Sequence, residues 1–166
     1  AQAATTPVAT AKAAVADVAD MTTATYGDWL LRCRAAADTY ARSCEVVQSL
    51  MLQGQAAPLA QLAFGRPGPK DPLYFTAVVP ANVTFPSSVR IALDEKDPKP
   101  VEVAYTRCLQ AGCFASVAVT DGTLASWRAQ DQAGRLVFKN AAGQEISVPM
   151  SFHGLARALD ALAKEK

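Results

Sequence analysis

The sequence predicts an all-β fold, mainly an antiparallel β-sandwich of the immunoglobulin-like class, with a short inserted helix and a C-terminal helix. Strand-length apolar runs recur at nearly regular spacing along the 166 residues, and Gly, Pro, Asn and Asp separate most of them. Four cysteines fall into two local pairs. Many short strands with turn residues between them are typical of a sandwich or barrel.

The first 25 residues differ in character from the rest. Residues 1–25 are rich in Ala, Thr, Val and Asp and contain no aromatic side chain. The chain begins at Ala1 without Met, and its first residues resemble the far side of a small-residue cleavage site. We therefore expect a flexible leader of an exported mature chain over 1–25, followed by a single disulfide-stapled domain over 26–166.

Strand-length segments follow from Tyr26 onward. We expect a first strand over 26–33, with Gly27 marking a bulge or a close approach, and a second over 45–52. Further strands are expected over 60–64, 73–79, 89–93, 101–106, 113–119, 135–139 and 145–150. Pro149 has no amide hydrogen to donate, so the last of these strands belongs at a sheet edge or ends there.

Two segments depart from the β pattern. Residues 121–130 predict a short helix that holds Leu124 and Trp127 on one side. Ser151 is the expected N-cap of a closing helix. Its apolar stripe, which we expect to cover one end of the sandwich, consists of Phe152, Leu155, Leu159 and Leu162.

The cysteines indicate the compartment. Local pairing of Cys33 with Cys44 and of Cys108 with Cys113 is the simplest of three possible connectivities. Zinc is the competing interpretation, but its sites usually carry spacers of about two to four residues in both halves. A redox role would need a Cys-x-x-Cys motif, which the sequence lacks. Two structural disulfides imply an oxidising compartment.

Composition excludes several functions. Apolar residues make up 51% of the chain and charged residues 19%, which rules out gross disorder. The formal charge of +1 is too small to attract nucleic acid or anionic lipid electrostatically. We expect no membrane span, no cofactor and no metal ion.

Three segments resemble a catalytic, a calcium-binding or a phosphate-binding site, but their residues do not fit these sites. His153 is the only histidine, and Ser151 lies two positions before it, but such near neighbours do not form a triad by themselves. Residues 94–97 contain three carboxylates in an order that does not match a calcium loop. The loop over 65–70 is basic, yet its prolines lack the amide donors that hold phosphate. We therefore expect no catalytic residue.

Candidate binding residues are few. Tyr26 and Trp29 would lie three apart on one strand, so they would point to opposite faces. We assign Trp29 to the core and Tyr26 to an exposed rim. Arg66 and Lys70, in the stiff 65–70 loop, are the other residues that we expect to contact a partner.

These residues together resemble the invasion-associated locus B (IalB) family of bacterial envelope proteins, over about residues 26–162. The matching features, in order, are Tyr26-Gly27-Asp28-Trp29 with Cys33, Cys44 with Gln48, Cys108-x-x-x-Gly112-Cys113, and Val148-x-Met150-Ser151-x-x-Gly154-Leu155. The resemblance implies an exported sandwich-like domain, linked in some pathogens to host-cell entry, with no established enzymatic activity.

We therefore expect an envelope or surface-associated binding protein, in the periplasm or on the outer surface of a Gram-negative bacterium, with a protein or other macromolecule as its partner. One alternative is a periplasmic hydrolase that uses His153. Another is a structural or chaperone-like protein that acts through a sheet edge.

Overall fold

The computed structural model describes residues 21–35, 42–94 and 96–165. In this part of the chain eight strands are followed by a helix, two further strands and a second helix. In order they are β1 (Met21–Tyr26), β2 (Trp29–Ala35), β3 (Arg42–Leu50), β4 (Ala60–Gly65), β5 (Tyr74–Val79), β6 (Ser88–Ala92), β7 (Val101–Leu109), β8 (Gly112–Ala118), α1 (Asp121–Ala129), β9 (Gly134–Lys139), β10 (Glu145–Met150) and α2 (Leu155–Lys164). The predicted all-β class with an inserted and a C-terminal helix is confirmed.

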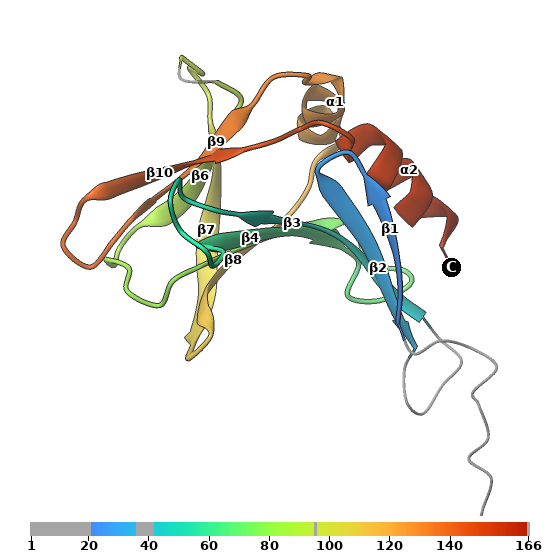
Figure 1. Ribbon diagram of the computed structural model, residues 1–166, viewed down its shortest axis with the longest axis horizontal. Coiled ribbons are helices and arrows are strands. Elements are labelled where there is room, and N and C mark those ends of the chain that lie inside the picture. Colours follow the sequence, from blue (N-terminus) through green and yellow to red (C-terminus); the bar gives the residue numbers. More distant parts are fainter. Residues whose placement is uncertain (1–20, 36–41, 95, 166) are drawn as a thin grey trace, which may run out of the picture.

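The ten strands form one antiparallel sheet, which folds over to make two packed layers. Its strand order is β1-β2-β3-β4-β5-β8-β7-β6-β9-β10. The first part of β7 pairs with β6, the second part pairs with β8, and the register shifts between Tyr105 and Arg107. A bulge of this kind lets a strand turn from one layer into the other. Figure 1 shows the result, with β9 and β10 above β3 and β4.

Aromatic side chains fill the core between the layers. Phe64 of β4 lies at its centre, with its ring centroid 5.6 Å from that of Trp29, 5.2 Å from that of Phe75 and 5.9 Å from that of Trp127. Trp127 brings α1 into this cluster, as its helical pattern predicts, and it also lies 6.2 Å from Phe152. Trp29 is 1% exposed, so its assignment to the core is correct.

The closing helix covers β1, β2 and β3 on the core side. Leu155 and Leu159 are buried and Leu162 is partly buried, as the stripe predicts. Two details of the prediction are wrong. The helix begins at Leu155, so Phe152 precedes it, and its N-cap is Gly154 rather than Ser151, with φ 88° and no side-chain cap.

The expected first strand is two strands. β1 and β2 form a hairpin whose closing residues, Tyr26 and Trp29, lie opposite each other. Gly27 has φ 58° at the first turn position and Asp28 has no positive φ, which fits a type II′ turn. Gly27 is therefore a turn residue and not a bulge. Because β1 begins at Met21, it extends into the segment expected to be a leader, whose residues 1–20 lie outside the described part.

Both cysteine pairs join neighbouring strands. Cys33 of β2 lies directly opposite Cys44 of β3, and Cys108 of β7 lies opposite Cys113 of β8. The structure joins each pair as a disulfide, with S–S distances of 2.10 Å and 2.01 Å. No helix in the described ranges has the length and apolarity needed to cross a bilayer.

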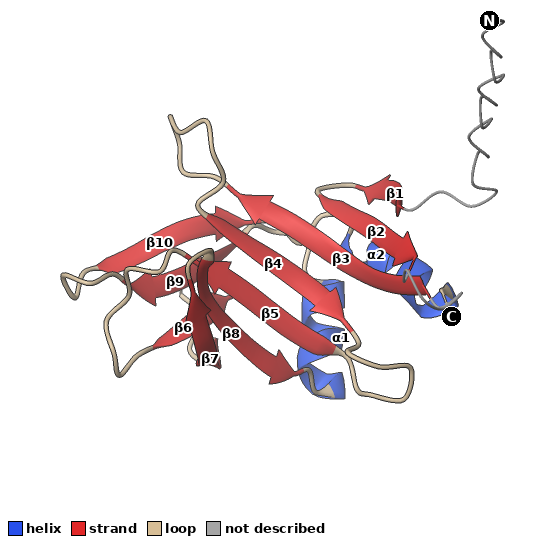
Figure 2. Ribbon diagram, turned by 90° about the horizontal axis from the view of Figure 1, so that it is seen from below, coloured by secondary structure: helices blue, strands red, loops and turns tan. Residues whose placement is uncertain are grey.

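Both edges of the sheet lie at the margins of Figure 2, with β1 on one side and β10 on the other. Ile146, Val148 and Met150 of β10 face the core, whereas Ser147 and Pro149 are exposed. Pro149 therefore lies on an edge strand, as its missing amide hydrogen requires.

Candidate functional site

The motif residues at the two ends of the domain meet in one place, which we call the junction: Gly27, Asp28, Trp29, Gln48, Ser151 and Gly154. Trp29 Nε1 and Gln48 Nε2 both donate to the carbonyl oxygen of Ser151, each at 3.0 Å. The amide of Ser151 donates back to Gln48 Oε1 at 2.9 Å. Gln48 is only 6% exposed, so these bonds satisfy a buried amide side chain.

The glycines of the junction allow the two segments to approach each other closely. A Cβ on Gly27 would lie 2.6 Å from the carbonyl oxygen of His153. A Cβ on Gly154 would lie 2.1 Å from the carbonyl oxygen of Tyr26. Asp28 N also donates to the carbonyl of His153 at 3.0 Å. Only glycine fits at these two contacts, which explains the two glycines of the junction.

The junction contains an acid, a hydroxyl and the histidine, but in the wrong arrangement for a catalytic triad. Ser151 Oγ donates directly to Asp28 Oδ2 at 2.5 Å. It also accepts a hydrogen bond from the backbone amide of His153 at 3.0 Å. A triad needs the imidazole between the hydroxyl and the carboxylate, where it takes the proton from the nucleophile. Here the carboxylate occupies that place, so the geometry holds the backbone and does not activate Ser151.

The binding residues expected from the sequence do not come together. Tyr26 lies half-buried at the junction, where β2 begins. Arg66 and Lys70 are exposed in the loop after β4. That loop follows the end of β4 that points away from the junction, because Gly65 opposes Glu45, whereas Leu62 opposes Gln48. They do not form one surface with Tyr26.

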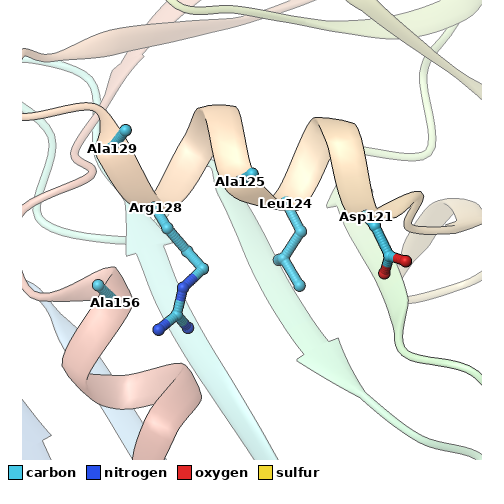
Figure 3. Close-up of a pocket in the computed structure, with 6 residues that line it drawn as sticks. All are labelled: Asp121, Leu124, Ala125, Arg128, Ala129 and Ala156. Atoms are coloured by element: carbon cyan, nitrogen blue, oxygen red, sulfur yellow. The ribbon is translucent and has the colours of Figure 1, made fainter.

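Two surface hollows lie away from the junction. The first, of about 540 Å³, lies between the helices and is lined by Asp121, Leu124, Ala125, Arg128, Ala129 and Ala156. Figure 3 shows its mainly small apolar wall along α1. Arg128 closes one end through an ion pair with Asp160 at 2.5 Å. The second, of about 210 Å³, lies over β6 and β9 and contains the ion pair of Arg90 with Glu145.

The Cys33–Cys44 disulfide lies beside a carboxylate. Its sulfur atoms and a carboxylate oxygen of Glu165 lie within 4.8 Å of one another. A sulfur atom in a disulfide is not a thiolate, and the thiolate is the form that binds a metal ion. This cluster is therefore no zinc site in the oxidised protein.

The β7–β8 hairpin carries a more suggestive surface, which sequence reasoning missed. We call it the hairpin patch. Arg107, Leu109 and Phe114 lie on one face of the hairpin, and Tyr105 lies on the other face with Phe85 of the β5–β6 loop against it. Phe85 is 59% exposed and Leu109 is 51% exposed, the first and third highest values among the exposed large apolar side chains of the described residues. The Phe85 ring lies edge-on to that of Tyr105, with centroids 5.4 Å apart.

Arg107 and the disulfide complete the patch. The Arg107 guanidinium lies 5.1 Å from the centre of the Phe114 ring. The Cys108–Cys113 disulfide ties the hairpin just before its turn. Figure 1 shows this hairpin, in yellow, projecting from the body of the protein. Aromatic, Arg and apolar side chains on a rigid projecting hairpin are typical of the centre of a binding surface.

Tyr105 has an unusual environment in this patch. Its hydroxyl oxygen is buried and has no hydrogen-bond partner among the described residues. Burial raises the pKa of Tyr105 above its ordinary value of 10.0, because the charged form loses its hydration. The patch therefore contains an unsatisfied polar atom, in contrast to the fully bonded Gln48.

Two sequence signals could have located the patch. Leu109 lies in the short loop between two cysteines, where a polar turn residue is the usual choice. Phe85 precedes a proline in a segment outside the predicted strands. Neither signal brings the two residues to the same hairpin, because Leu109 is positioned by the pairing of β7 with β8 and Phe85 reaches Tyr105 from the loop before β6.

Comparisons with known proteins agree with the fold and the motifs. A family model described as "Invasion associated locus B (IalB) protein" matches residues 29–163. No curated protein matches the chain at a significant level. The crystal structure of invasion associated protein b from Bartonella henselae is similar, with a TM-score of 0.70 and 19% sequence identity. The match covers 86% of this chain and 95% of that one.

Proposed function

The chain belongs to the invasion associated locus B (IalB) family, and on that premise we propose that it is an exported binding domain of the bacterial cell envelope. It acts by contacting another macromolecule, most simply a protein, and not by catalysing a reaction. The observation that carries this proposal is the disulfide-tied β7–β8 hairpin, where exposed Leu109 lies on the same face as Arg107, and exposed Phe85 of the β5–β6 loop lies against Tyr105. Exposed apolar residues grouped in this way mark interaction surfaces.

The disulfides support an oxidising location for this domain. In a reducing cytoplasm, cysteines facing each other at Cys33–Cys44 and Cys108–Cys113 would remain thiols. The absence of a strong net charge argues for a protein partner over a polyanion. We place the domain in the periplasm or on the outer surface of a Gram-negative bacterium.

The junction argues against the hydrolase alternative. Its polar side chains are engaged in holding backbone segments together, and Ser151 bonds directly to Asp28. Neither surface hollow includes a junction residue. The side chains available for chemistry thus have a structural role, and those available for binding lie elsewhere.

Partner capture by matched variants tests the proposal. Tagged wild-type protein, Phe85→Ser, Leu109→Ser and Met51→Ser are each incubated with envelope extract, and the bound proteins are quantified by mass spectrometry. Met51 is the control because it is also exposed, at 44%, but lies outside the patch. We expect a protein that wild type and Met51→Ser retain equally, and that either patch variant retains at least tenfold less.

Circular dichroism must show that all four proteins are folded. Equal capture by the patch variants and by wild type would refute the assignment of the patch. Turnover of an ester or peptide substrate that disappears in His153→Ala would instead establish the hydrolase.

A further inference from the structure

The two edges of the sheet differ in how they are protected from further pairing. β10 carries Pro149, which has no amide hydrogen, and the charged Glu145. β1, with the sequence Met-Thr-Thr-Ala-Thr-Tyr, contains neither proline nor a charged residue. Proline and charge are the usual means by which edge strands avoid pairing with other chains. β1 therefore lacks both devices, although it runs for six residues.

Within the described residues β1 pairs on one side only, with β2. Tyr26 and Trp29 close a two-residue turn, so they form a hydrogen-bonded pair. Because antiparallel pairs alternate along the strand, the amides and carbonyls of Met21, Thr23 and Thr25 point to the open edge. The open edge thus presents backbone donors and acceptors at every second residue.

We propose that β1 pairs antiparallel with β1 of a second copy of this chain, about a two-fold axis near Thr23. In that register Thr23 lies opposite Thr23 of the second copy, and Met21 lies opposite Thr25. Cross-strand Thr pairs are favourable, and an uncharged strand brings no like charges together when it pairs with itself. Met21, which is 52% exposed, gains a neighbour on the adjoining strand.

A second copy fits this edge better than an open chain of copies. Two-fold pairing of β1 with itself uses the same edge in both molecules and closes the assembly. The remaining edge of each copy is β10, where Pro149 interrupts further pairing. The expected product is a dimer with one continuous sheet and not a fibre.

Two variants test this pairing in the full chain. Thr23→Pro removes only an outward-facing amide, so the β1–β2 ladder remains and the contact between copies is lost. Thr23→Lys places two like charges at the axis. Ser49→Lys is the matched control, since Ser49 is exposed on β3, which has a partner strand on each side.

Sedimentation equilibrium from low micromolar to about 500 µM protein measures the dissociation constant of the dimer. We expect a dimer for wild type and for Ser49→Lys, and at least tenfold weaker association for both Thr23 variants with unchanged circular dichroism. If Thr23→Pro does not fold, Thr23→Lys decides. A wild-type protein that is monomeric throughout, or Thr23 variants that associate like wild type, would overturn the proposal.

Discussion

The junction and the hairpin patch lie in different parts of one sheet. They differ in whether their buried polar groups have hydrogen-bond partners. At the junction the buried Gln48 side chain has partners on both its oxygen and its nitrogen, and the indole of Trp29 shares one of them. At the patch the Tyr105 hydroxyl has no hydrogen-bond partner within residues 21–35, 42–94 and 96–165, and Phe85 and Leu109 face solvent.

This difference separates residues that maintain the fold from residues available for function. Buried polar groups that are fully bonded stabilise one arrangement of the backbone. Exposed apolar groups add little to the stability of the isolated protein, and a buried hydroxyl without a hydrogen bond lowers it. The family motif that is easiest to read in the sequence thus belongs to the junction, whereas the proposed binding surface lies outside most of it.

The largest effect should come from removing the close approach at the junction. Gly154→Ala must accommodate both a φ of 88° and a Cβ only 2.1 Å from the Tyr26 carbonyl oxygen. We expect a loss of about 4 kcal/mol in the free energy of unfolding, measured by urea denaturation. Gly54→Ala is the control, because Gly54 has φ 85° with nothing within 4 Å, and should lose only about 1 kcal/mol. Equal losses would show that the junction is not tightly packed.

A smaller effect should follow from a cavity under the closing helix. Leu159 is 5% exposed, and its removal in Leu159→Ala should lower the free energy of unfolding by about 3 kcal/mol. The disulfides should remain intact, as non-reducing peptide mapping can verify. An unchanged melting temperature together with lost partner capture would instead make α2 a docking surface and extend the functional region to the junction side.

At the hairpin patch, removing the Tyr105 hydroxyl oxygen should stabilise the protein, in contrast to the two substitutions above. Tyr105→Phe removes the unpaired hydroxyl and should raise the free energy of unfolding by about 1 kcal/mol at neutral pH. Because burial raises the pKa of Tyr105 in the folded state, its neutral form contributes stability below pH 10. Wild type loses that contribution as the pH rises through the raised pKa, whereas the Phe variant does not. Melting curves between neutral and strongly alkaline pH measure the divergence.

The smallest effect should come from His153→Ala. The side chain is exposed, and the junction uses the backbone amide and carbonyl of this residue. We expect the free energy of unfolding to change by less than about 0.5 kcal/mol and partner capture to remain. A large loss of a biological activity in the folded variant would show that the junction does more than hold backbone.

The class of fold could be predicted from the sequence because strands and helices leave local patterns of apolar residues. Alternation identified the inward face of β10, and helical spacing identified Leu155 and Leu159. The close approach expected at Gly27 is confirmed. The bulge expected there is wrong, since a strand with a bulge and two strands with a two-residue turn have the same apolar pattern. Sequence reasoning also failed at Ser151, whose hydroxyl bonds to Asp28 across a separation of 123 residues. The hairpin patch was missed for the same reason, because Phe85 meets Tyr105 only after β6 and β7 have paired.

The junction has a consequence for the order in which the protein becomes folded. Trp29 and Ser151 are separated by 122 residues, and Gln48 and Ser151 by 103. Contacts this distant in the chain require large loops to close, which slows folding. A ribosome produces the chain from its N-terminus, so β1, β2 and β3 are complete long before Ser151 exists. Throughout that interval Gln48 lacks its partner, and the β1–β2 hairpin lacks the helix that covers it. The fold is completed only when residues 151–165, which hold the Ser151 contacts and α2, have been made.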